Sequence, residues 1–177
     1  YHIKYKLKGQ DVYMIAATTR PETMLGDTAL AVNPKDERYQ KYIGKTAILP
    51  ILDRELAIVA DDYVDIEFGT GVVKITPAHD PNDFEVSQRH DLEKINILNP
   101  DSTLNENAGK FKGQDIKTAR KLVLEELEKK SLLAKVEDYE HSVGTCYRCS
   151  TVVEPYLSEQ WFVRMKPLAK PAIEALK

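Results

Sequence analysis

The stretch from residue 69 to residue 84 constrains the fold more than any other part of the chain. It reads GTGVVKITPAHDPNDF, a glycine-flanked turn and a β-branched run followed by two aspartates three residues apart. Asp80 suits the N-cap of a helix and the proline after it suits the first helical position. The pattern therefore predicts a buried strand over 72–76 that leads directly into a helix over 80–90. Asp83 then falls in the first helical turn, beside Asp80.

These two aspartates have two interpretations. In the first, Asp80 is only a helix cap and Asp83 only stabilises the positive end of the helix dipole. In the second, the two carboxylates at the strand-to-helix turn hold an ammonium group and a hydroxyl of one ligand. The stretch alone does not separate the two interpretations.

A second polar stretch, residues 18–27, reads TTRPETMLGD and follows an apolar strand pattern. Threonine hydroxyls can orient a water or a ligand hydroxyl, and a fixed arginine such as Arg20 can bind a phosphate or a ribose. Threonine before proline is also ordinary turn chemistry, so this stretch is a weak signal by itself.

The length and composition fit one soluble globular domain, or one domain with an appended arm. The chain has 177 residues, of which 42% are hydrophobic and 30% charged. No apolar run approaches the length that spans a membrane. The formal net charge is −3, whereas a domain that grips duplex nucleic acid over a large area is usually basic. We therefore expect the domain to contact little of any nucleic-acid partner, or to depend on other domains for affinity.

The two cysteines, Cys146 and Cys149, form a single C-x-x-C pair. Such a pair argues against a disulfide framework and favours a reduced, cytoplasmic setting. It also supplies half of the ligands of a tetrahedral zinc site. The chain has no initiator methionine and begins almost inside a strand at Tyr1, so we expect a fragment of a longer protein.

The remaining pattern predicts an α/β fold, a barrel-like mixed β-sheet core with surrounding helices. Strands are expected over 2–8, 12–18, 28–32, 46–49, 55–60, 72–76 and 95–98, and helices over 36–42, 80–90 and 116–130. Asp115 suits the N-cap of the last helix. Residues 99–112 are polar and turn-rich, which predicts a mobile surface loop. A boundary near Gly144 divides the chain into a body, residues 1–143, and a C-terminal arm, residues 144–177.

Three blocks together resemble the editing domain of class I aminoacyl-tRNA synthetases for branched aliphatic amino acids, most like the valyl members. The blocks are TTRPETMLGD, the KITPAHDPND run, and the C-terminal CYRC, VEP and QWFV segments. Leucyl members share the first two blocks but typically carry a methionine where Lys74 stands. Isoleucyl members typically carry TTxPWT, and a histidine near that position. The resemblance covers nearly the whole chain and implies the same barrel-like fold with an arm that returns to the synthetase body.

The resemblance implies a catalytic set of Asp83, Thr23 and Lys74. Asp83 is expected to bind the α-ammonium of the aminoacyl group, and Thr23 to contact the ester region. Lys74 lies between Val73 and Ile75, so strand alternation turns its side chain to the opposite face. The alternative is that Lys74 is a solvated strand residue without a functional role.

The resemblance also implies a set of substrate-binding residues that includes Asp83. Arg20 is expected to contact the terminal ribose or phosphate, and Thr76 to line the pocket on the same face as Lys74. Asp80, as an acceptor, is the first candidate for the polar group that meets a side-chain hydroxyl, and Lys74 is the second. Phe68 either shapes the pocket or stacks on a base, or it packs in the core.

The implied function is post-transfer editing, in which an oriented water hydrolyses the aminoacyl ester of mischarged threonyl-tRNA(Val). Pre-transfer editing is a further activity that the resemblance leaves open. The implied partners are the 3′ acceptor end of tRNA(Val) carrying threonine and the rest of the synthetase chain. No cofactor is expected in this fragment, with Cys146 and Cys149 as half of a zinc site in the full-length enzyme. His79 is either a general base or a structural residue. Alternative functions are an acceptor-end binding module that is inactive once excised, an isoleucyl or leucyl editing domain, and a zinc-ribbon-like interaction domain, which a single C-x-x-C disfavours.

Overall fold

The computed structural model describes residues 1–176. Seven strands form one mixed sheet in the order β2-β1-β4-β5-β3-β6, with β7 beside β1. The strands are β1 (His2–Leu7), β2 (Tyr13–Ala17), β3 (Ala29–Val32), β4 (Thr46–Ile48), β5 (Glu55–Ala60), β6 (Val72–Ile75) and β7 (Leu133–Lys135). The β3–β5 pair is parallel and the other pairs are antiparallel. The end strands β2 and β6 contact each other, so the sheet is nearly closed into a barrel, as predicted.

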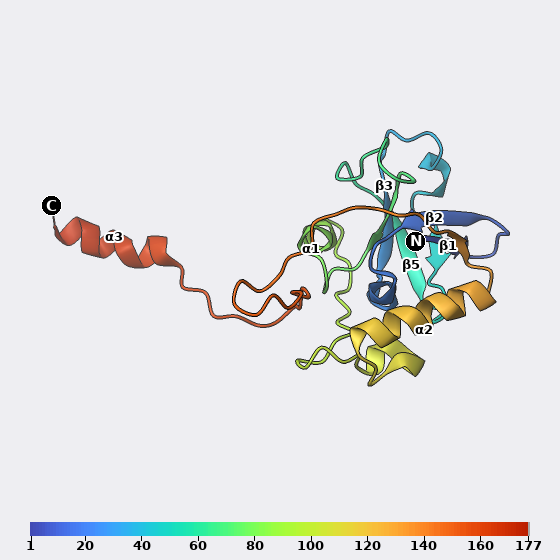
Figure 1. The fold of residues 1–177 in the computed structure, drawn as a ribbon. Helices are drawn as coiled ribbons and strands as arrows, with labels where there is room; N and C mark the ends of the chain where they lie inside the picture. Colours follow the sequence, from blue (N-terminus) through green and yellow to red (C-terminus); the bar gives the residue numbers. More distant parts are fainter. Residues whose placement is uncertain (177) are drawn as a thin grey trace.

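Within residues 1–176, three α-helices and three short 3₁₀ segments accompany the sheet. They are α1 (Pro81–Arg89), α2 (Ile116–Lys129), α3 (Met165–Ala175), η1 (Pro21–Gly26), η2 (Gln40–Tyr42) and η3 (Glu106–Phe111). Helices α1 and α2 lie against the body, whereas α3 lies at the far end of an extended arm (Figure 1). No helix within residues 1–176 combines the length and the apolar character needed to cross a membrane.

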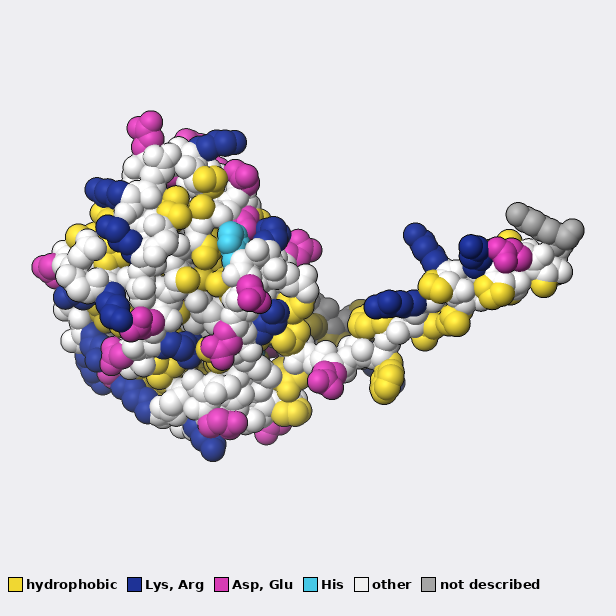
Figure 2. Space-filling model, turned by 180° about the vertical axis from the view of Figure 1, so that it is seen from behind, with side chains coloured by type: hydrophobic (Ala, Val, Ile, Leu, Met, Phe, Trp, Pro, Cys, Tyr) yellow, Lys and Arg dark blue, Asp and Glu magenta, His cyan; other side chains and the backbone are white. Residues whose placement is uncertain are grey.

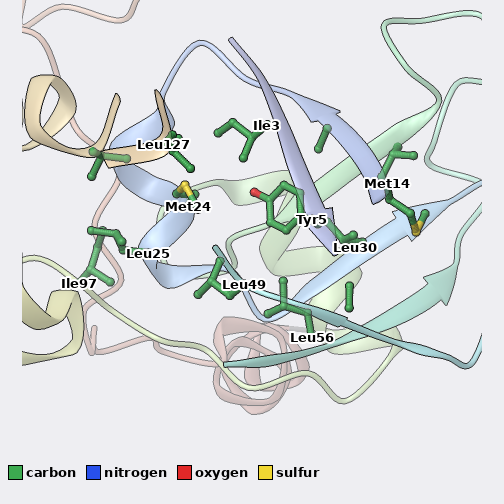
Figure 3. Close-up of a cluster of buried hydrophobic side chains, with 14 of the residues drawn as sticks. Ile3, Tyr5, Met14, Met24, Leu25, Leu30, Leu49, Leu56, Ile97 and Leu127 are labelled. Atoms are coloured by element: carbon green, nitrogen blue, oxygen red, sulfur yellow. The ribbon is translucent and has the colours of Figure 1, made fainter. Parts of the chain in front are cut away.

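The core is built from the inward-facing residues of the strands and from one face of the surrounding segments. Strand β1 alternates, so that Ile3, Tyr5 and Leu7 are buried while their neighbours are more exposed. Figure 3 shows Met24 and Leu25 of η1 among these strand residues. All six residues of η1 are buried, so this segment is fixed by packing on both sides.

Helix α2 forms where its sequence predicts it. The Asp115 side chain accepts hydrogen bonds from the backbone N–H groups of Lys117 (3.0 Å) and Thr118 (3.1 Å), which is an N-cap. One stripe of the helix then enters the core, namely Ala119, Val123 and Leu127, all at 0% exposure.

Three local predictions were wrong. The predicted helix over 36–42 is a series of turns that ends in η2, because the Asp36 carboxylate accepts from the Arg38 backbone N–H and side chain and competes with helical bonds. The predicted strand over 95–98 forms a single bridge, Leu98 to Leu104. The 99–112 segment is not simply a surface loop, because Ala108 and Phe111 are buried.

The arm exposes large apolar side chains along its length (Figure 2). Trp161 and Phe162 are 101% and 88% exposed. The sequence pattern did not predict α3. The division into 1–143 and 144–177 stays a prediction, and its last residue lies outside the described part of the chain.

Candidate functional site

One cavity of ≈ 580 Å³ brings together every site residue that the sequence predicted apart from the cysteine pair. Its walls come from the end of β2, η1, β6, the start of α1, the 61–70 loop and the segment that follows β7. The predicted residues that line it are Arg20, Thr23, Phe68, Lys74, Thr76, Asp80 and Asp83. The 69–84 stretch therefore meets the TTRPETMLGD block in the folded chain. Lys74 of the first and Thr23 of the second are hydrogen-bonded although they lie 51 residues apart in the sequence.

Lys74 is held in a buried polar network. Its Nζ donates to the side-chain oxygens of Thr23 (3.1 Å), Asp27 (3.2 Å) and Thr76 (2.5 Å). An ammonium group has three hydrogens to donate, so all of them are used inside the chain. Lys74 is 9% exposed, and the alternative of a solvated strand residue is wrong.

Asp27 is the centre of this network, and the sequence reasoning missed it. Its carboxylate accepts from Lys74, from the Thr76 hydroxyl (2.6 Å) and from the Tyr5 hydroxyl (2.7 Å). Burial raises the pKa of Asp27, while the Lys74 charge and the hydrogen bonds act in the opposite direction. An acid between a buried Met-Leu-Gly turn and the apolar strand β3 was the available signal, since such an acid needs a partner.

Asp83 is 7% exposed and is fixed by the strand beside it. Its Oδ2 accepts a hydrogen bond from the Thr76 backbone N–H at 2.8 Å. Its other oxygen, Oδ1, has no hydrogen-bond partner within residues 1–176. Burial raises the pKa of Asp83 to about 7, and the nearby Lys74 charge lowers it in part. A cation that enters the cavity would favour the ionised form of this acid.

Asp80 is the N-cap of α1, which confirms the predicted cap but does not exclude a ligand role. Its Oδ1 accepts from the backbone N–H groups of Asn82 (2.8 Å) and Asp83 (3.3 Å). Its Oδ2 has no partner in the described part of the chain. One carboxylate can therefore cap the helix and still offer an acceptor to a ligand, and the ligand role stays a prediction.

His79 is a structural residue rather than an available base. Its Nε2 accepts from the Ile97 backbone N–H (3.0 Å), which places the ring hydrogen on Nδ1, where it donates to the Pro155 carbonyl (3.2 Å). Burial lowers the pKa of His79 to about 4. Both ring nitrogens are thus engaged, and the ring is neutral at physiological pH.

Arg20 lines the cavity and is held by partners that the sequence did not predict. Its Nη1 donates to the His79 carbonyl (3.0 Å) and its Nη2 pairs with the Glu154 carboxylate. Glu22 lies 3.8 Å from Nε of Arg20 and makes a two-pronged ion pair with Arg120. These contacts span up to 134 residues of sequence, which no local pattern reveals.

Phe68 lies at the mouth of the cavity. Phe68 is 64% exposed, so the alternative that it packs in the core is wrong. Tyr63, in the same loop, is 45% exposed and also lines the cavity. The entrance is therefore flanked by exposed aromatic rings.

The cysteine pair lies in a tight turn of the arm, away from this cavity. The turn is closed by hydrogen bonds from Cys146 N–H to the Thr151 carbonyl and from Ser150 N–H to the Cys146 carbonyl, both 2.8 Å. Its two thiols would provide half of a tetrahedral ligand set. No cluster of three or more histidine, cysteine or acidic side chains within residues 1–176 is arranged to hold a metal ion.

Comparison with known proteins places this site in a family. The family model described as "Leucyl-tRNA synthetase, editing domain" matches residues 34–128. The chain is 62% identical over 177 residues to a valine–tRNA ligase of Fervidobacterium nodosum, 59% to one of Thermotoga maritima and 60% to one of Petrotoga mobilis. Each of these alignments includes 100% of this chain and 20% of the relative, so the chain spans about a fifth of the length of those proteins.

Two solved structures share the fold. One is the ternary complex of Agrobacterium radiobacter K84 LeuRS with tRNA and LeuAMS, with a TM-score of 0.60 and 19% identity over 74% of this chain and 19% of that chain. The other, GlLeuRS-CP1, has a TM-score of 0.63 and 14% identity over 80% of this chain and 99% of that chain. Since the family model also matches more than half of its residues, the chain belongs to the family of aminoacyl-tRNA synthetase editing domains.

Proposed function

We propose that this chain hydrolyses threonyl-tRNA(Val) as the editing domain of a valine–tRNA ligase. The observation that carries the proposal is the pair Asp80 and Asp83. Each presents one carboxylate oxygen without a partner in residues 1–176, and both line the same cavity. An aminoacyl ester of threonine carries an ammonium group and a hydroxyl that such a pair can bind together.

Asp83 binds the ammonium group. Its Oδ1 completes its hydrogen bonding when the cation enters, and the Thr76 N–H keeps Oδ2 in place. The free site holds a carboxyl with a pKa of about 7, so a bound cation shifts it to the ionised form at neutral pH. The ammonium is common to all aminoacyl esters, and this contact therefore fixes orientation rather than selectivity.

Asp80 reads the hydroxyl through Oδ2. Valine and threonine have nearly the same shape, and an apolar pocket rejects poorly an isostere that only adds a hydroxyl. A second site that hydrogen-bonds the hydroxyl selects in the opposite direction, because valine leaves the acceptor unpaired at a cost of about 1–3 kcal/mol. Lys74 is the weaker candidate for this role, since its three hydrogens already have acceptors.

Hydrolysis proceeds by direct attack of water. The Thr23 hydroxyl donates to the Arg20 carbonyl and accepts from Lys74, which leaves one lone pair to orient a water. The water oxygen bonds to the ester carbonyl carbon, the bond from that carbon to the ribose oxygen breaks, and a water proton ends on that ribose oxygen. The fixed Lys74 charge stabilises the negative charge that develops on the carbonyl oxygen.

The acceptor end enters between Phe68 and Arg20. An exposed ring stacks on any base, and the remaining N–H groups of Arg20 bind the terminal ribose or phosphate. The net charge of −3 supports a small nucleic-acid contact. The rest of the synthetase chain then supplies most of the affinity for tRNA.

The test is deacylation of threonyl-tRNA(Val) and valyl-tRNA(Val) by the chain, with Asp62→Asn, a change at an exposed acid outside the cavity, as the control. We expect faster release of threonine than of valine from the unmodified chain and the control. Binding of tRNA without release of either amino acid would contradict the proposal and favour an acceptor-end binding module.

A further inference from the structure

We propose that Glu154, in the arm, is a positioning residue of the site, because it fixes the Arg20 guanidinium at the cavity wall. The inference rests on the proposed function and extends it to a part of the chain that the site residues of the barrel do not include. It makes the start of the arm, rather than the barrel alone, a component of the editing site.

Glu154 is the main carboxylate partner of Arg20. The other acid nearby, Glu22, is 2% exposed and has each of its oxygens 2.8 Å from a nitrogen of Arg120. Glu22 therefore lies 3.8 Å from Arg20 and cannot hold it closely. The side chains of Arg20 and Glu154 are 26% and 18% exposed, so their pairing is largely shielded from solvent.

The residue after Glu154 makes a second contact to the same turn. The Pro155 carbonyl accepts from His79 Nδ1 (3.2 Å), and the His79 carbonyl accepts from Arg20 Nη1 (3.0 Å). Arg20, Glu154, Pro155 and His79 therefore form a closed ring of contacts. Asp80 directly follows His79, so the ring connects the ribose-binding side of the site to the side where Asp80 would bind the substrate hydroxyl.

The arm continues along α1 after this ring. Tyr156 and Leu157 share a groove with Phe84 and Gln88 of α1, and the arm then leaves the body (Figure 1). Within residues 1–176, the ring is thus the last hydrogen-bonded attachment of the arm to the body, and the groove contacts of Tyr156 and Leu157 follow it.

Loss of the Glu154 charge frees the Arg20 side chain and weakens its contact with the acceptor end. Because that contact exists in the bound ground state as well as in the transition state, its loss raises KM more than it lowers kcat. We expect KM for threonyl-tRNA(Val) to rise about tenfold in Glu154→Ala, within the range that misplacement of a binding group causes.

The experiment measures kcat and KM of threonyl-tRNA(Val) deacylation for Glu154→Ala, Glu154→Asp, Arg20→Ala and the Glu154→Ala/Arg20→Ala double variant. Glu159→Gln, an exposed acid of the same arm, is the matched control. We expect the control to have the wild-type KM and Glu154→Asp to show a smaller rise in KM than Glu154→Ala. The KM of the double variant should be no higher than that of Arg20→Ala. Thermal unfolding confirms that each variant is folded.

An unchanged KM in folded Glu154→Ala would overturn the inference, and so would effects of the two single changes that multiply in the double variant. A lower KM in Glu154→Ala would also overturn it, because Glu154 would then compete with the tRNA phosphate for Arg20. If the unmodified chain releases no threonine, the proposed function fails. The same variants are then compared by affinity for an RNA oligonucleotide ending in CCA, where equal affinities would overturn the positioning role separately.

Discussion

The Thr76 backbone N–H donates to the Asp83 carboxylate at 2.8 Å, which ties the first turn of α1 to the end of β6. The Thr76 side chain at the same time donates to the buried Asp27 carboxylate at 2.6 Å. One residue therefore connects the buried Lys74 network to the acid that faces the cavity. Changes on either side of Thr76 should be measurable as changes in stability before any substrate is added.

The first prediction concerns the pH dependence that Asp83 imposes on stability. Burial raises its pKa from 3.8 to about 7, so between these values the folded chain holds a proton that the unfolded chain has released. The Asp83 contribution to stability therefore falls as the pH rises through this window. Asp83→Asn keeps an acceptor for Thr76 and removes the titration. We expect urea unfolding to show the variant gaining stability relative to wild type from pH 4 to pH 8; parallel profiles would contradict this.

The second prediction concerns His79 and has the opposite sign. Burial lowers its pKa from 6.5 to about 4. Between these pH values the unfolded chain therefore binds a proton at His79 and the folded chain does not. Its contribution to stability is complete above pH 6.5 and is lost as the pH falls toward 4. We expect His79→Gln to be less stable than wild type at pH 7, because it disturbs the two ring hydrogen bonds. Because glutamine cannot take up a proton, we also expect the variant to lose less stability than wild type between pH 6.5 and pH 4. The prediction fails if the gap between the two proteins stays constant over that range.

The third prediction concerns the pair of Asp27 and Lys74. Asp27→Asn leaves a buried ammonium without a carboxylate, and breaking a buried pair in this way costs about 3–5 kcal/mol. Replacing Lys74 by methionine in the same chain removes the unpaired charge and keeps a side chain of similar length. We expect the double variant to unfold at a higher urea concentration than Asp27→Asn alone. Independent, additive losses from the two changes would show that the pair is not coupled.

The parts of the fold that were predictable from the sequence are those set by neighbouring residues. The β1–β2 hairpin and the caps Asp80 and Asp115 depend on alternation and on residues two or three positions away. The 36–42 segment was mispredicted for an equally local reason, because the Asp36 side chain competes with helical hydrogen bonds.

The parts of the site that escaped prediction depend on contacts between distant segments. Asp27 reaches Lys74 across 47 residues, Arg120 reaches Glu22 across 98, and Glu154 reaches Arg20 across 134. A sequence shows that each of these residues is charged, but its partner is decided by how the barrel closes and where the arm returns. The resemblance to editing domains gave roles to Arg20 and Thr23 but none to Asp27 or Glu154, although these two residues lie in the same quoted segments.

The central claim is that Asp80 distinguishes threonine from valine while Asp83 binds what the two share. The most direct measurement is deacylation of threonyl- and valyl-tRNA(Val) by wild type, Asp83→Ala and Asp80→Ser. Serine keeps the N-cap and removes the second carboxylate oxygen. We predict that Asp83→Ala slows both reactions alike by roughly ten- to a hundredfold, the equivalent of a charge-assisted contact of about 1.5–3 kcal/mol. We also predict that Asp80→Ser slows threonine release selectively and narrows the ratio of the two rates. An Asp80→Ser chain that loses both rates in equal proportion would contradict the claim, because Asp80 would then act only as a helix cap.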